Sequence, residues 1–188
     1  MLAGTRSDVY RLNLLAREAL KPEKRLRSET TMETDRGPRA FAIGERMMFT
    51  RNSRPLRVKN GQTGTLVAWS INGEGHVEYT IIVDGGKRVV IDTARYPHLE
   101  YGYAVSVHKA QGQSVEYAFV LMSDAMVDRE WSYVAASRHR KTLLVFVVEE
   151  QVEIIERQMA RSRQKEVAMA YEAEVVRGGE VCLEIERE

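Results

Sequence analysis

One stretch of the sequence joins a short apolar run to a polar turn: Tyr103-Ala104-Val105-Ser106-Val107-His108-Lys109-Ala110-Gln111-Gly112-Gln113-Ser114. The apolar run predicts a buried strand, and a second strand is predicted at residues 118–122. Asp128 then provides an N-cap for a helix that extends to about Ser137. Residues 142–148 form a continuous apolar run, typical of a parallel strand that is buried on both faces. This order of strand, turn, strand, helix and strand predicts an α/β fold.

On the N-terminal side of this stretch, apolar residues recur at helical spacing, and Ser7 or Asp8 can cap the first turn. The apolar positions are Val9, Leu12, Leu15, Ala16 and Ala19. Residues 1–3 resemble the end of a strand, so we expect the chain to begin inside a larger fold. Residues 21–40 are polar, with Pro22, Gly37 and Pro38, and indicate a linker or an exposed crossover.

Between these parts, residues 41–99 alternate short β-type runs with turn signals. The runs are residues 46–50, 64–69, 76–83 and 87–91. Glycines follow Asn or Asp at Asn60-Gly61, Asn72-Gly73 and Asp84-Gly85, where tight hairpins require positive φ angles. This segment predicts a small barrel or rolled sheet.

After Glu149 the sequence predicts a charged helix with Val152, Ile155 and Met159 on one face. The apolar stripe is lost near Ser162. Val181, Leu183 and Ile185 alternate with polar residues, which indicates either an edge strand or a tail.

Composition excludes several classes of protein. The 188 residues include 28 basic and 27 acidic ones, so a formal net charge of +1 gives no global attraction to nucleic acid or membrane. The single cysteine excludes an intrachain disulfide, and no run approaches the roughly 20 apolar residues of a transmembrane helix. No secretory signal is present, so we expect a cytoplasmic protein without membrane insertion. The four histidines are widely spaced, and we expect no metal site.

Catalytic patterns are scarce. The sequence lacks a Gly-x-x-x-x-Gly-Lys-Ser/Thr phosphate loop and any triad-like arrangement that can be argued from spacing. Two loops remain as candidate ligand sites because they lie at the ends of buried elements. The first is residues 108–114, and the second is the cationic cluster at residues 137–141. Compensation of a helix dipole explains the second loop about equally well.

These two loops carry a family resemblance. Residues 103–112 resemble motif V of the RecD-like superfamily 1B DNA helicases, and Tyr133-Val134-Ala135-Ala136-Ser137-Arg138 resembles their motif VI. Residues 5–13 resemble motif IV, and residues 41–59 resemble the entry to an inserted Src-homology-3-like barrel, domain 2B. After motif V, the sequence around Ser114 differs from the corresponding sequence of RecD relatives. A hydroxyl at this place is similar to the helicase part of conjugative relaxases of the MobF type, which we prefer to a RecD-type repair helicase.

The resemblance implies a partial RecA-like domain, 2A, with the inserted barrel 2B and a C-terminal helix. The expected divisions are residues 1–40 for the motif IV helix and linker, 41–99 for the barrel, 100–150 for the rest of 2A, and 151–188 for the helix and tail. It also implies ATP-driven 5′-to-3′ translocation on plasmid DNA by the full-length protein. The alternatives are a non-catalytic module for DNA binding or secretion recognition, or a fragment of a repair helicase.

The resemblance also assigns residues. Arg138 matches the arginine that stabilises charge on the γ-phosphate, and Arg6 is either a second γ-phosphate contact or a surface arginine. Gly112, Ser114 and Arg140 are expected near the nucleotide. The expected DNA contacts are His108, Lys109, Gln111, Arg54 and Arg57, although the basic loop that holds the last two is explained as well by solvation.

The implied partners are single-stranded DNA, an N-terminal RecA-like domain of the same protein and a type IV secretion coupling protein. ATP and Mg²⁺ are expected in the full-length protein, and no cofactor is expected in the isolated chain, which we expect to be inactive alone.

Overall fold

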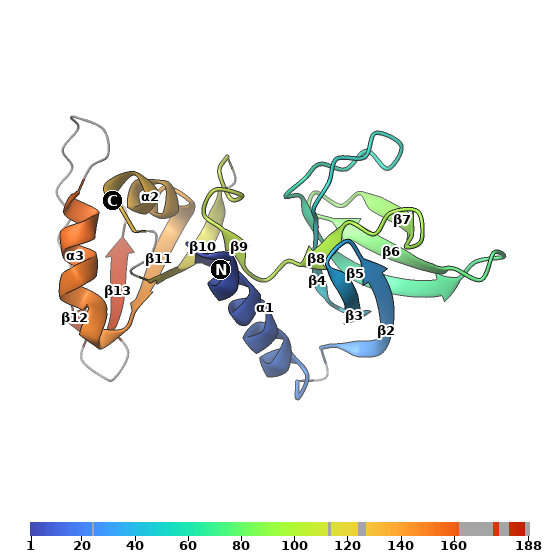
Figure 1. The fold of residues 1–188 in the computed structure, drawn as a ribbon, viewed down its shortest axis with the longest axis horizontal. Helices are drawn as coiled ribbons and strands as arrows, with labels where there is room; N and C mark the ends of the chain where they lie inside the picture. The colour runs from blue at the N-terminus through green and yellow to red at the C-terminus, as the bar shows by residue number, and fades with distance from the viewer. Residues whose placement is uncertain (24, 113, 124–126, 162–174, 177–180, 187–188) are drawn as a thin grey trace. The chain divides into compact units, whose positions relative to one another are not determined.

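The computed structural model describes residues 1–23, 25–112, 114–123, 127–161, 175–176 and 181–186 (Figure 1). The chain forms two compact units. Unit 1 combines Met1–Leu12 with Ala104–Glu188, and unit 2 is Asn13–Tyr103. No helix among the described residues is both long and apolar enough to cross a membrane.

Unit 1 is built on a mixed sheet with the strand order β12-β13-β11-β10-β1-β9. Its parallel strands are β1 (Leu2–Ala3), β9 (Val105–Ser106), β10 (Val115–Met122) and β11 (His139–Val147). Strand β13 (Val181–Glu186) pairs antiparallel with β11, and β12 (Val175–Val176) pairs antiparallel with β13. The sheet is therefore predominantly parallel, as the order of elements in the sequence predicts.

Helices α2 (Arg129–Ala136) and α3 (Val152–Ala160) contribute to the core of unit 1, and a short 3₁₀ turn, η1 (Glu149–Gln151), precedes α3. Trp131 and Ile155 from the helices are buried with Val120 and Val145 from the sheet. The predicted cap of α2 is confirmed, because Asp128 Oδ1 accepts a hydrogen bond from Trp131 N at 2.7 Å.

Burial of the central strands alternates rather than covering both faces. Val145 and Val147 are buried, whereas Leu144 and Phe146 are partly exposed. Tyr117 on β10 is 55% exposed. The expectation that residues 142–148 are buried on both faces is therefore wrong for the described part of the chain, since the core elements pack against one face.

Helix α1 (Arg6–Leu20) begins earlier than the sequence predicts. Thr5 Oγ1 accepts a hydrogen bond from Asp8 N at 3.0 Å and donates one to Asp8 Oδ2 at 2.6 Å. Thr5, rather than Ser7 or Asp8, is therefore the N-cap, and Asp8 supports it from the first turn.

Unit 2 contains a five-stranded antiparallel sheet with the order β7-β6-β5-β4-β8. Its strands are β4 (Arg46–Phe49), β5 (Thr63–Ile71), β6 (Val77–Val83), β7 (Arg88–Asp92) and β8 (Leu99–Tyr101). The first four correspond to the four predicted β runs, and β8 was not predicted because three residues carry little periodicity.

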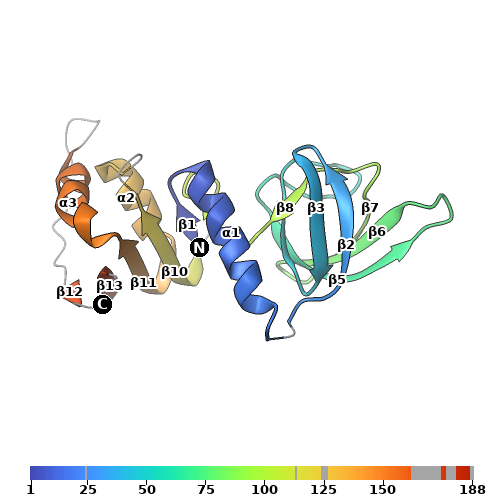
Figure 2. The same ribbon diagram turned by 60° about the horizontal axis from the view of Figure 1, so that its bottom comes forward.

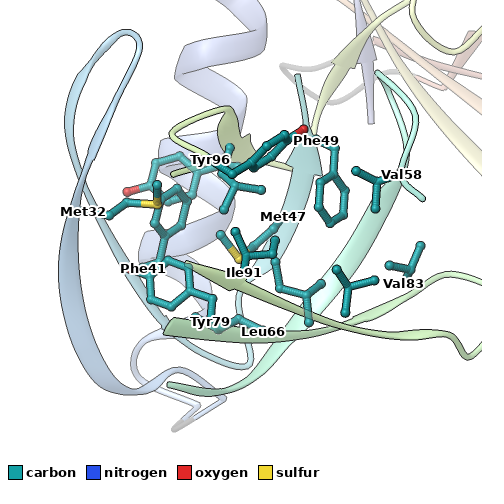
Figure 3. Packing of buried hydrophobic residues seen from close by; sticks show 14 residues of the cluster. Met32, Phe41, Met47, Phe49, Val58, Leu66, Tyr79, Val83, Ile91 and Tyr96 are labelled. Carbon is teal, nitrogen blue, oxygen red and sulfur yellow. The ribbon is translucent and has the colours of Figure 1, made fainter. Parts of the chain in front are cut away.

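Residues 21–40 do not form the expected linker. Strands β2 (Arg27–Thr34) and β3 (Gly37–Ile43) pair as an antiparallel hairpin and lie side by side (Figures 1 and 2). Met32 and Phe41 from this hairpin enter the core, where the Phe41 ring lies edge-on to Tyr79 at a centroid distance of 6.0 Å (Figure 3). The hairpin is stabilised by residues that are distant in sequence. Most residues of β2 are polar, so the sequence does not show the apolar–polar alternation that would indicate a strand.

A glycine is required where the chain leaves unit 2. A Cβ atom at Gly102 would lie 2.9 Å from the carbonyl carbon and oxygen of Met47. Gly102 N also donates to Arg46 O at 2.8 Å. This close approach of the two backbones keeps the residue after β8 against β4.

Candidate functional site

The end of the 108–114 turn lies beside Arg138. Val115 N donates a hydrogen bond to Arg138 O at 2.9 Å, and Val115 pairs with His139 in the parallel ladder between β10 and β11. Ser114, Arg138 and Arg140 therefore gather at the amino ends of these two strands. The structure brings together three of the predicted nucleotide-site residues, which lie up to 26 positions apart in sequence.

The guanidinium of Arg138 is held against the end of α2. Its Nε donates to Val134 O at 2.9 Å, and its Nη2 donates to Ser137 Oγ at 2.6 Å. A cation at this place also complements the negative end of the helix dipole. Arg138 thus stabilises the helix end in this structure, and its side chain is partly exposed at the same time.

The other residues of the cationic cluster differ in their burial and in their contacts. His139 is only 3% exposed, and its Nδ1 lies 2.5 Å from Ala136 O. Lys141 forms an ion pair with Glu116 at 3.0 Å and lies over the Tyr117 ring, 5.8 Å from its centroid. Arg140 is exposed. Of these residues, Arg138 and Arg140 are the ones suited to receive an anion.

The turn after β9 is anchored by its apolar residues. Val107 and Ala110 are buried, whereas His108, Lys109 and Gln111 are exposed. Ala110 N donates to Ser106 O at 3.1 Å, and Gly112 has a φ of +83°, which favours glycine. The turn therefore presents an imidazole, an ammonium and an amide to solvent from a fixed backbone.

Arg6 lies at the opposite end of the sheet from Arg138. Leu2 of β1 pairs with Val120 of β10, and Ser123, just beyond β10, donates to Asp8 Oδ2 at 3.0 Å. Arg138, by contrast, contacts the start of β10. Since a strand rises about 3.3 Å per residue, the two ends of β10 are about 23 Å apart. The structure does not bring Arg6 to the place where Arg138 lies.

Arg6 instead shares an edge with the turn that carries His108. Ala3 pairs with Ser106, and β1 and β9 are parallel neighbours. The segments that leave these two strands, residues 4–6 and 107–109, therefore emerge at the same carboxyl edge of unit 1. Exposed Arg6 stands at the first position of α1, where a cation opposes rather than complements the helix dipole.

Unit 2 presents the predicted basic loop. Arg54 and Arg57 are exposed, and Arg57 adopts a left-handed φ of 52°. Lys87 Nζ donates to Leu56 O at 2.8 Å and to Arg57 O at 3.0 Å, which supports this conformation. The sequence placed Lys87 at the start of a predicted β run and gave no sign of its contact with the loop, because 30 residues separate it from Arg57.

Comparison with known proteins identifies relatives of this chain. Residues 101–146 match the family of the UvrD-like helicase C-terminal domain. The chain is 34% identical over 152 residues to the conjugal transfer protein TraA of Rhizobium radiobacter, and 35% identical over 149 residues to TraA of Agrobacterium fabrum. Each match covers 78% of this chain but only 13% of the TraA protein. The RecD subunit of the RecBCD enzyme from Mycobacterium tuberculosis is 28% identical over 127 residues, 65% of this chain and 21% of that protein.

Solved structures share the fold. The Pif1 helicase from Bacteroides in complex with ADP-AlF3 and ssDNA superposes with a TM-score of 0.56 at 19% identity, covering 74% of this chain and 37% of that chain. Pif1 from Candida albicans gives a TM-score of 0.50 at 15% identity over 73% of this chain and 42% of that chain. These similarities support a RecA-like helicase fold with a parallel sheet.

Identity with the TraA proteins is higher, and extends over more of the chain, than identity with the RecD subunit, which agrees with the preference for a conjugative helicase drawn from Ser114. The chain is thus a relative of the TraA conjugal transfer proteins and resembles the RecD-like superfamily 1B DNA helicases.

Proposed function

We propose that this chain is the second motor domain of a conjugal transfer helicase of the TraA type. The observation that carries the proposal is the hydrogen bond from Val115 N to Arg138 O, which places Ser114 beside Arg138 at one end of the parallel sheet. In this proposal, an N-terminal RecA-like domain of a longer protein supplies the phosphate loop and the carboxylate for Mg²⁺. The two domains close on ATP, and hydrolysis drives 5′-to-3′ movement along single-stranded DNA.

The residues at this end of the sheet fit phosphate oxygens. Arg138 and Arg140 offer positive charge, Ser114 offers a hydroxyl, and Gly112 lets a ligand approach the backbone. Arg138 stabilises the negative charge that develops on the γ-phosphate during transfer. Mg²⁺, when bound through the other domain, neutralises charge on the same phosphates.

The two units correspond in this proposal to domains 2A and 2B. Unit 1 is the RecA-like part, and α3 is its C-terminal helix. Unit 2 is the inserted Src-homology-3-like barrel, which its antiparallel sheet and single aromatic-rich core support. The hairpin of β2 and β3 joins this barrel, so the insertion begins earlier than residue 41.

We assign single-stranded DNA to the carboxyl edge of unit 1, where residues 4–6 and 107–109 emerge from neighbouring strands. Arg6, His108 and Lys109 can contact backbone phosphates there, with Gln111 following in the same turn. Arg6 thus acts on DNA rather than on the γ-phosphate. Arg54 and Arg57 of unit 2 offer further phosphate contacts. Single-stranded DNA is bound by the similar Bacteroides Pif1 helicase, which supports this choice of ligand.

The test is ATP turnover by the longer protein carrying Arg138→Ala. We expect turnover to fall about 10³-fold or more, with single-stranded DNA binding retained, because the arginine acts mainly on the transition state. Arg157→Ala is the control, since Arg157 is a 75% exposed arginine on α3 paired with Glu153. Turnover near the unaltered rate in Arg138→Ala would overturn the proposal.

A further inference from the structure

We infer that Ser137 is a positioning residue that sets the orientation of the Arg138 guanidinium for its action on a nucleotide phosphate. This inference rests on the function proposed above. Ser137 Oγ accepts from Arg138 Nη2 at 2.6 Å and from Arg138 Nε at 3.2 Å, so one oxygen contacts two N–H groups on one edge of the guanidinium.

The hydroxyl is itself held in place. Ser137 Oγ donates to Val134 O at 3.0 Å, and the same carbonyl accepts from Arg138 Nε at 2.9 Å. Val134 O, Ser137 Oγ and the guanidinium therefore form a closed set of hydrogen bonds. Because a hydroxyl has one proton to donate, its donation to Val134 O leaves its lone pairs directed to the arginine.

The backbone of Arg138 is fixed on both sides. Arg138 N donates to Ala135 O at 3.2 Å, and Arg138 O accepts from Val115 N at 2.9 Å. The next side chain, His139, is buried with its Nδ1 against Ala136 O. With the backbone anchored, the remaining freedom of Arg138 is rotation of its side chain, and the hydrogen bonds to Ser137 Oγ restrict that rotation.

Loss of this hydroxyl should act on catalysis more than on binding. In Ser137→Ala the guanidinium keeps its contact with Val134 O but loses the bonds that orient its plane. Misplacement of a catalytic group by about 1 Å can cost on the order of 100-fold in rate. We expect kcat for ATP to fall about 10- to 100-fold in the longer protein, with KM for ATP changed less than about twofold.

Two variants separate orientation from simple stabilisation of the helix. Ser137→Thr keeps the hydroxyl at a residue with φ −71° and ψ 0°, and we expect it to restore most of kcat. Ser132→Ala removes a comparable bond in the same helix, from Ser132 Oγ to Asp128 O at 2.7 Å, and we expect it to leave kcat unchanged. A loss of kcat in Ser132→Ala equal to that in Ser137→Ala would show a structural role and overturn the inference.

A measurement on the 188-residue chain tests the geometry without turnover. The Nη2–H protons of Arg138, assigned by NMR in ¹⁵N-labelled protein, should exchange with solvent slowly because Nη2 donates to Ser137 Oγ, and Ser137→Ala should accelerate their exchange at least about 10-fold while Ser132→Ala does not. An unchanged exchange rate in Ser137→Ala overturns the inference.

The outcomes distinguish the inference from the proposed function. If Arg138→Ala abolishes turnover but Ser137→Ala behaves like the unaltered protein, the inference fails and the function stands. If Arg138→Ala itself retains turnover, the proposed function fails, whatever the NMR result for Ser137.

Discussion

Arg17 Nε lies 3.0 Å from Oε2 of Glu45, a carboxylate whose side chain is fully buried. Glu45 also accepts from Tyr103 OH at 2.8 Å and from Ala42 N at 3.2 Å. Burial alone would lower the pKa of Arg17, but hydrogen bonds with Glu45 and Glu29 outweigh burial and raise it. One buried acid thus joins α1 to β3 and to the residue where the chain leaves unit 2.

Glu45→Ala should destabilise unit 2 strongly. The substitution removes one of the two carboxylates that pair with the buried guanidinium of Arg17, and Glu29 remains. Breaking a buried pair costs about 3–5 kcal/mol, so the free energy of unfolding, measured by urea denaturation, should fall by up to this amount. Glu18→Gln is the matched control, because the Glu18–Lys21 pair is exposed and water screens it. Equal effects of the two substitutions would contradict a structural role for the buried pair.

Stability should fall as pH rises above about 10. Burial, and then the charge of Glu45, raise the pKa of Tyr103 above its ordinary value of 10.0. The unfolded chain therefore loses this proton first, so the contribution of Tyr103 is complete below pH 10 and is lost as pH rises toward the folded-state pKa. In Tyr103→Phe we expect a shallower loss between pH 10 and 12 by urea denaturation at fixed ionic strength. Tyr117→Phe, at a 55% exposed position, should leave the slope unchanged. An identical slope in Tyr103→Phe and the unaltered chain would exclude this origin.

The chain should bind single-stranded oligonucleotides weakly, without sequence preference, and less tightly as salt rises. Arg54, Arg57 and Lys109 are exposed cations, and each phosphate contact contributes about 0.7 to the slope of log K against log salt. Replacing all three by glutamine should flatten the slope by about 2 in fluorescence titrations. The matched control replaces Lys21, Arg95 and Arg157, which form exposed ion pairs elsewhere. A slope that flattens equally in the control would mean that net charge, rather than these side chains, governs binding.

Local signals account for the elements that were predicted well. Turn residues such as Asn72-Gly73 and Asp84-Gly85 specify hairpins through their own backbone preferences, and β5, β6 and β7 follow from them. Asp128 caps the start of α2 through a hydrogen bond to Trp131, which is only three positions away in the sequence. These features depend only on residues that are close together in the sequence.

Elements that depend on distant partners were missed. The hairpin of β2 and β3 has a polar exposed face, and its place in the core comes from contacts such as that of Phe41 with Tyr79 and Tyr101. Similarly, no local signal marks Glu45 as a buried acid, because its partners Arg17 and Tyr103 are 28 and 58 positions away.

Motifs and turn preferences are short-range properties, so the fold class and the helicase resemblance could be predicted from the sequence, and the site residues could be named as candidates. Tertiary structure alone decided which of those residues meet. Strand order places Ser114 beside Arg138 and Arg6 at the far end of β10, since parallel pairing aligns the ends of strands that lie far apart in the chain. The contact of Ser137 Oγ with the Arg138 guanidinium is likewise visible only in the tertiary structure, because it depends on the conformation of the chain at the end of α2.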